Sequence, residues 1–136
     1  MKKVKLLSTW IGDRPAWYGK FAAQWTRFKA VDWEPCIPWF DNLSGKRQEK
    51  KQLKWLNGLV QKRLGIACNK MDASLCDLRP AFGELFADLY AEYEWWGWCD
   101  VDILCGDLDR LLPPLLENCD VLHFKERYLS GCFALF

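Results

Sequence analysis

The chain has 136 residues, the length of one domain, and 51% of them are hydrophobic against 27% charged, which excludes a disordered chain. A net charge of +1 gives no strong basic field of the kind that binds nucleic acid, so we expect no nucleic-acid partner. The sequence contains no apolar stretch long enough for a transmembrane segment, and the run after the N-terminal lysines is too short for a signal peptide.

The first half of the chain alternates strand and helix patterns. In chain order we predict a strand, an amphipathic helix, a second strand and a charged surface helix: residues 4–9, 16–29, 31–39 and 46–64. The first helix is predicted because Trp17, Phe21 and Trp25 recur at helical spacing. Two prolines interrupt the second strand, so we expect it to be an edge strand or a short piece, and Gly65 can cap the surface helix.

The second half continues this alternation. We predict, in order, a loop, a helix, a buried central strand, a short helix and two strands: residues 66–78, 79–93, 95–103, 107–116, 121–125 and 132–136. Pro113 and Pro114 are expected to end the short helix. Helices that alternate with strands predict an α/β fold, with a Rossmann-like, mostly parallel sheet that helices cover on both faces.

Cysteine is frequent, with 7 copies, while histidine occurs once. The cysteines lie among apolar residues and form no C-x-x-C pair, so the chain lacks the usual ligands of a zinc site. Cysteines in such surroundings act as small buried hydrophobic residues. We therefore expect reduced thiols and a cytoplasmic protein.

The triplet Asp100-Val101-Asp102 is the feature most indicative of chemistry. If the central strand runs through it, the two carboxylates point to the same face, because side chains alternate with period two. Neighbouring carboxylates at the end of a buried strand repel each other, and Mn²⁺ or Mg²⁺ would relieve that repulsion. Ligands of open α/β sheets also bind at the carboxyl ends of strands. Asp107 and Asp109 are expected to lie at the start of the next helix instead.

Three segments carry a family resemblance: CDLRPAFG (76–83), WGWCDVDILCGD (96–107) and SGCFALF (130–136). They resemble a family of predicted glycosyltransferases that is similar to the type-A (nucleotide-sugar, D-x-D) glycosyltransferase fold. The resemblance implies a single nucleotide-sugar-binding domain over residues 1–136, corresponding to the N-terminal donor-binding part of that fold. It also implies relatives that extend further, so we expect this chain to be incomplete at its C-terminus and to lack an acceptor-binding half.

The resemblance also implies roles for individual residues. Asp100 and Asp102 would hold a divalent metal, Mn²⁺ or Mg²⁺, on the donor diphosphate. Arg79 would reach the donor's phosphates or sugar, and Asp77 would orient Arg79 or a sugar hydroxyl. A surface ion pair between Arg79 and Asp77 is the alternative for both.

Two aromatic positions and one further acid complete the expected donor site. Trp10 and Asp13 lie in the loop after the first strand, where this fold binds the nucleotide base. Trp98 shares the predicted face of Asp100 and could contact the sugar. For both tryptophans, packing in the core is the alternative.

The implied reaction moves a glycosyl group from a nucleotide-sugar donor to a hydroxyl of a glycan or another acceptor. One alternative is a haloacid-dehalogenase-like phosphatase, in which Asp100 would be the nucleophile and Asp102 the acid/base. That motif normally lies near the N-terminus, whereas here it follows several elements. The other alternative is a non-catalytic binding module whose carboxylates are simply solvated.

Overall fold

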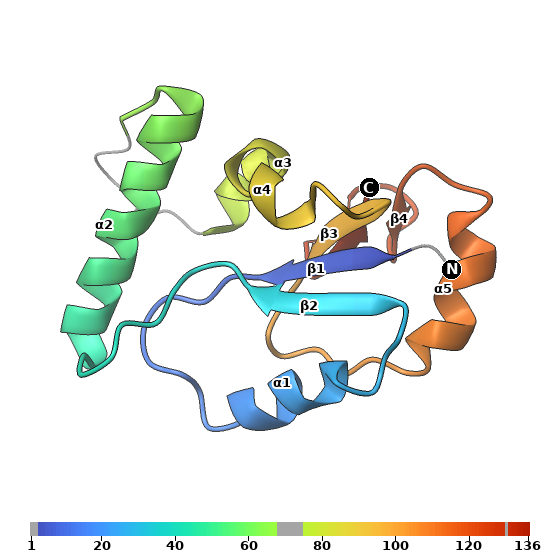
Figure 1. Cartoon of the computed structure of the whole chain (residues 1–136), viewed down its shortest axis with the longest axis horizontal. Helices are drawn as coiled ribbons and strands as arrows, with labels where there is room; N and C mark the ends of the chain where they lie inside the picture. The colour runs from blue at the N-terminus through green and yellow to red at the C-terminus, as the bar shows by residue number, and fades with distance from the viewer. Residues whose placement is uncertain (1–2, 68–74, 130) are drawn as a thin grey trace.

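A five-stranded sheet forms the centre of the computed structural model, which describes residues 3–67, 75–129 and 131–136 (Figure 1). The strand order is β2-β1-β3-β5-β4. The bounds are Val4–Ser8 for β1, Val31–Pro35 for β2, Trp95–Cys99 for β3, Leu122–His123 for β4 and Phe133–Leu135 for β5. The prediction of an edge strand at β2 is therefore confirmed.

The sheet is mixed rather than mostly parallel. Strand β1 pairs in parallel with β2 and β3, whereas β5 runs antiparallel to both β3 and β4. The reason is the connection between β4 and β5, which is too short for the crossover that parallel neighbours require. The α/β class is confirmed, and parallel pairing is confined to the first three strands.

Helices cover both faces of the sheet, as predicted (Figure 1). Two of them, α1 (Tyr18–Trp25) and α5 (Leu108–Leu116), pack against one face, where Leu6, Phe21 and Leu112 belong to one buried cluster. The other face carries α2 (Gly45–Leu64), a 3₁₀ helix (Leu75–Ala81), α3 (Phe82–Leu85) and α4 (Ala87–Tyr90). There Leu7, Leu56 and Phe82 belong to a second cluster.

Helix α2 follows its prediction closely. It ends at Gly65, whose φ of 67° is in the left-handed region that favours glycine. Its buried face includes Gln52, whose side chain accepts a hydrogen bond from the Gly12 amide at 2.8 Å and donates one to the Pro38 carbonyl at 3.1 Å. This glutamine therefore fixes the loop after β1 against the helix.

One helix prediction is wrong, and the prediction over 107–116 is confirmed as α5 except for its stop at the prolines. The predicted helix over 79–93 is broken into the 3₁₀ helix, α3 and α4, and Pro80, which has no N–H to donate, lies inside the 3₁₀ helix. The predicted stop at Pro113 does not occur, because α5 continues to Leu116. Leu112 and Leu116 are both buried, so core packing outweighs the low helix propensity of proline.

The central strand is shorter than predicted, since it ends at Cys99 and a turn follows. Beyond this turn, the side chain of Gln24 in α1 bonds the backbone at two positions. Its amide donates to the Ile103 carbonyl at 3.0 Å, and its oxygen accepts from the Cys105 N–H at 2.9 Å. The placement of residues 100–102 on the strand is therefore wrong. Of the predicted loop over 66–78, residues 68–74 lie outside the described residues.

Among the described residues, no helix combines the length and apolar character needed to cross a membrane.

Candidate functional site

The carboxyl ends of the three parallel strands β1, β2 and β3 lie side by side and form what we call the carboxyl edge of the sheet. Ser8 is hydrogen-bonded to both neighbouring strands there. The Ser8 hydroxyl donates to the Cys99 carbonyl at 2.8 Å and accepts from the Trp33 indole at 2.9 Å. The Ser8 carbonyl accepts from the Cys36 N–H at 3.0 Å. The segments that leave this edge, including Asp100 after β3, therefore start from a fixed frame.

Asp100 is the first residue beyond β3 at this edge. Its N–H donates to the Cys132 carbonyl at 2.9 Å, which holds it beside the start of β5. Its carboxylate oxygen Oδ1 accepts from the guanidinium of Arg79. The Asp100 side chain is 35% exposed and that of Arg79 11%, so the pair joins a buried cation to an accessible anion.

Arg79 reaches this edge from the 3₁₀ helix. Its ion pair in the described structure is with Asp100, not with Asp77, which is exposed, so the surface-pair alternative for Arg79 is wrong. Its Nε is buried and has no hydrogen-bond partner among the described residues. A Cβ at Gly131 would lie 3.3 Å from Arg79 Nη1, so the segment before β5 passes close to the guanidinium.

Asp102 lies in the turn after β3 and is exposed. Between the two acids, Val101 is buried against the α1 face of the sheet. Because both acids lie beyond the end of β3, strand alternation does not set their direction as predicted. Both carboxylates remain accessible in the turn.

Asp100 and Asp102 can supply oxygen ligands to a divalent cation. The described residues include no group of three or more His, Cys, Asp or Glu side chains that could hold a metal by themselves. Mg²⁺ is commonly held by one or two carboxylates, with substrate phosphates and water as the remaining ligands. The residues present fit that arrangement, in which the metal needs a bound diphosphate.

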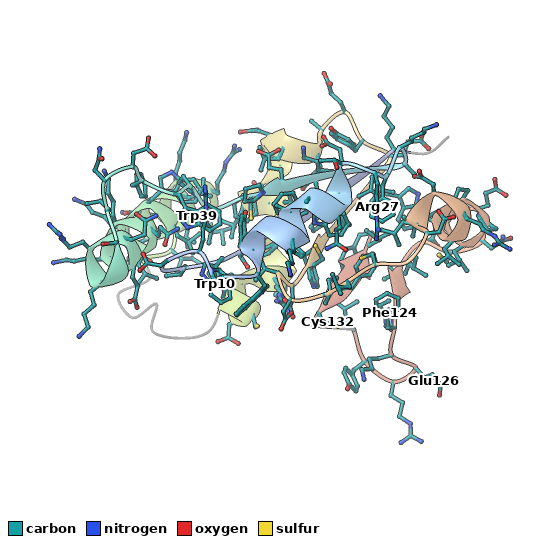
Figure 2. All side chains as sticks on the ribbon, turned by 90° about the horizontal axis from the view of Figure 1, so that it is seen from below. Trp10, Arg27, Trp39, Phe124, Glu126 and Cys132 are labelled. Carbon is teal, nitrogen blue, oxygen red and sulfur yellow. The ribbon has the colours of Figure 1, made fainter. Side chains whose placement is uncertain are left out.

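The loop after β1 has structural contacts at both predicted donor residues. The Asp13 carboxylate accepts from the Gly45 N–H at 2.9 and 3.0 Å, at the first turn of α2, where Ser44 gives no side-chain cap. Asp13 thus caps that helix. The Trp10 indole donates to the Asp13 carbonyl at 2.7 Å. Figure 2 shows Trp10 and Trp39 near this loop.

Trp98 lies in the core, the alternative that the sequence left open. It is 3% exposed and packs against Phe82 and Phe136, with ring centroids 5.9 and 5.1 Å apart. A role in sugar contact therefore has no support from its position.

Two residues at the carboxyl edge, Ser8 and Gly131, are not predicted from the sequence pattern. Ser8 ends β1, in which Lys5 is the other polar residue. A buried hydroxyl at this place needs hydrogen-bond partners. Gly131 precedes the last strand, which is a position where a close approach of backbone is common. The sequence shows both features, but it does not identify Cys99 as the partner of Ser8 or Arg79 as the neighbour of Gly131.

Comparison with known proteins adds a family. A model of a family of unknown function, DUF6625, matches residues 7–136. The chain belongs to this family. No curated protein and no solved structure matches the chain. The DUF6625 match spans Arg79, Asp100, Asp102 and Gly131, but its description attaches no activity to them.

Proposed function

We propose that this DUF6625 chain binds a nucleotide sugar where β1 and β3 end, and transfers its sugar to a hydroxyl acceptor. The observation that carries this proposal is the Arg79–Asp100 pair. It places a buried cation next to an accessible carboxylate, directly before a second exposed carboxylate, at the carboxyl ends of parallel strands. The type-A glycosyltransferase resemblance and the parallel pairing of β1 with β2 and β3 support the same assignment.

Each residue has a defined part in the proposed site. Asp100 and Asp102 would hold Mn²⁺ or Mg²⁺, which would offset the negative charge of the leaving diphosphate. Arg79 would orient Asp100 through their ion pair and add positive charge beside the anionic oxygens of the donor. Asp77 is exposed two residues before Arg79 in the chain and would orient a sugar hydroxyl.

Thermal unfolding tests this proposal with UDP, GDP, ADP and dTDP, each with and without Mn²⁺. We expect one of these nucleotides to raise the Tm by several degrees when Mn²⁺ is present and by less when it is absent, because each ligand completes the other's site. Asp102→Asn should remove the joint effect. Asp120→Asn changes an exposed acid next to β4 and should retain it.

No joint stabilisation of the wild-type chain by any of the four nucleotides would contradict the proposal. A phospho-aspartate trapped at Asp100 by a phosphate monoester substrate would instead establish the phosphatase alternative.

A further inference from the structure

Helix α2 carries a concentration of positive charge that the net charge of the chain conceals. It has seven basic residues and one acidic residue, a net of +6, whereas the whole chain carries +1, so the remainder carries −5. Figure 1 places α2 at the opposite end of the molecule from α5, with one side turned away from the sheet. The charge is therefore local and sits at one end of the protein.

The outward side of α2 is defined here as the basic face. Its members are all exposed and positively charged: Lys46, Arg47, Lys50, Lys51, Lys54 and Lys62. Lys46, Lys50 and Lys54 recur every four residues, which places them in one row along the helix. Glu49 interrupts the run in sequence, but it lies about 100° around the helix from Lys50, on the flank of the basic face.

Among the described residues, no salt bridge includes a residue of the basic face. The ion pair that α2 makes among the described residues joins Arg63 to Asp88, and Arg63 is outside the basic face. Uncompensated basic residues on one helix attract a surface of opposite charge.

Apolar side chains lie beside the basic face. A groove of about 590 Å³ is lined by Phe40, Trp55 and Leu59 together with three lysines of the basic face, Lys51, Lys54 and Lys62. Trp55 is 36% exposed, and Lys51 Nζ lies 4.4 Å from the centre of the Phe40 ring. Tryptophan beside lysine is typical of groups at a lipid–water interface, where the indole enters the headgroup layer and the ammonium stays at the phosphates.

We propose that the basic face of α2 docks on an anionic lipid membrane. A cluster of four to eight basic residues on one helix is the pattern by which proteins bind acidic headgroups. The helix has 20 residues, so it would lie along the surface for about 30 Å. Nucleic acid is the less suitable partner, because five of the six basic residues are lysine and an apolar groove adjoins them, whereas phosphate recognition in nucleic acids favours the planar guanidinium of arginine.

Vesicle co-sedimentation of the wild-type chain without nucleotide or metal tests this docking independently of sugar transfer. We expect binding to vesicles of phosphatidylcholine with phosphatidylglycerol, little binding to phosphatidylcholine alone, and weakening as salt is raised. K50E/K54E should bind the anionic vesicles at least about 30-fold more weakly. K20E/K125E is the matched control, because it makes the same change of charge at exposed positions outside α2 and should bind within a few-fold of the wild-type chain.

Circular dichroism checks that both double variants retain the fold. Equal vesicle binding by K50E/K54E and the wild-type chain would overturn the proposal, as would equal loss in both variants or no binding to anionic vesicles. Binding of a DNA duplex that K50E/K54E loses, without vesicle binding by the wild-type chain, would overturn it in favour of a nucleic-acid surface.

Discussion

The guanidinium of Arg79 is buried, while its partner Asp100 keeps about a third of its side chain in contact with solvent. A buried cation requires compensation, because its desolvation is costly without a paired charge. Arg79 therefore stabilises the fold through Asp100, and it also keeps a buried Nε for which the described residues provide no acceptor. These two properties make Arg79 both a structural residue and the candidate cation for an anionic ligand.

Replacing Arg79 tests its structural part. Arg79→Ala should lower the free energy of unfolding by about 1–2 kcal/mol, since Asp100 loses its partner but can still be solvated. Urea denaturation measures this change. Asp77→Asn is the control at an exposed site two residues away and should leave the value unchanged. If Arg79→Ala unfolds at the same urea concentration as the wild-type chain, the pair makes no net contribution to stability.

Asp109 joins two parts of the fold through its carboxylate. It accepts hydrogen bonds from the N–H groups of Ala30, at 2.7 Å, and Lys29, at 2.8 and 3.0 Å. These bonds hold the pKa of Asp109 below its ordinary value of 3.8. A carboxyl group whose pKa is lower in the folded state contributes stability above its unfolded pKa, and this contribution is lost as the pH falls through the folded pKa.

Asp109→Asn should therefore have a lower Tm than the wild-type chain at neutral pH. The difference should shrink as the pH falls below 3.8, because the wild-type carboxyl group then also becomes neutral. Thermal unfolding across a pH series measures it. A Tm difference that stays constant down to acidic pH would show that the charge of Asp109 has no part in its effect.

At the scale of elements, β3 approaches β5 without room for a side chain at Gly97. A Cβ there would lie 1.9 Å from the Ala134 carbonyl oxygen and 2.8 Å from Leu135 Cδ2. The carbonyl belongs to the strand ladder, so it cannot move away without loss of the pairing that positions Asp100.

Gly97→Ala should lower the free energy of unfolding by about 3 kcal/mol, at the upper end of the usual cost of overpacking. Gly58→Ala in α2 is the matched control. A Cβ at Gly58 meets nothing within 4 Å, and alanine favours a helix over glycine, so a gain of about 0.5–1 kcal/mol is expected. Urea denaturation of both variants gives the comparison. A Gly97→Ala chain as stable as the wild type would show that the two strands can separate without cost.

Local patterns predicted those elements whose causes are local. Helix α2 and its cap at Gly65 follow from the apolar face of the segment and from the left-handed conformation that glycine favours. The path of the chain after β3 does not follow from its own sequence, because the side chain that bonds Ile103 and Cys105 belongs to Gln24 in α1. The same holds for the candidate site. The D-x-D residues were found from the sequence, but the partner of Asp100 is a tertiary contact with Arg79, 21 residues away.

At the scale of the whole molecule, the candidate metal ligands and the basic face of α2 lie in different parts of the fold. The carboxylates Asp100 and Asp102 follow β3 at the edge where the parallel strands end, whereas the basic residues are concentrated on α2. The described residues offer a metal two accessible carboxylates at that edge and no third acidic or nitrogen ligand. A site of this composition should bind Mn²⁺ weakly by itself and tightly when phosphate oxygens complete the coordination.

Electron paramagnetic resonance of free aqueous Mn²⁺ measures that dependence directly. The wild-type chain alone should remove little of the signal. With at least one of UDP, GDP, ADP and dTDP present, the wild-type chain should remove clearly more of the Mn²⁺ signal than that nucleotide removes without protein. Asp100→Asn/Asp102→Asn should abolish this additional loss. If the double variant and the wild-type chain remove the same amount with every nucleotide, the two carboxylates do not form a metal–diphosphate site.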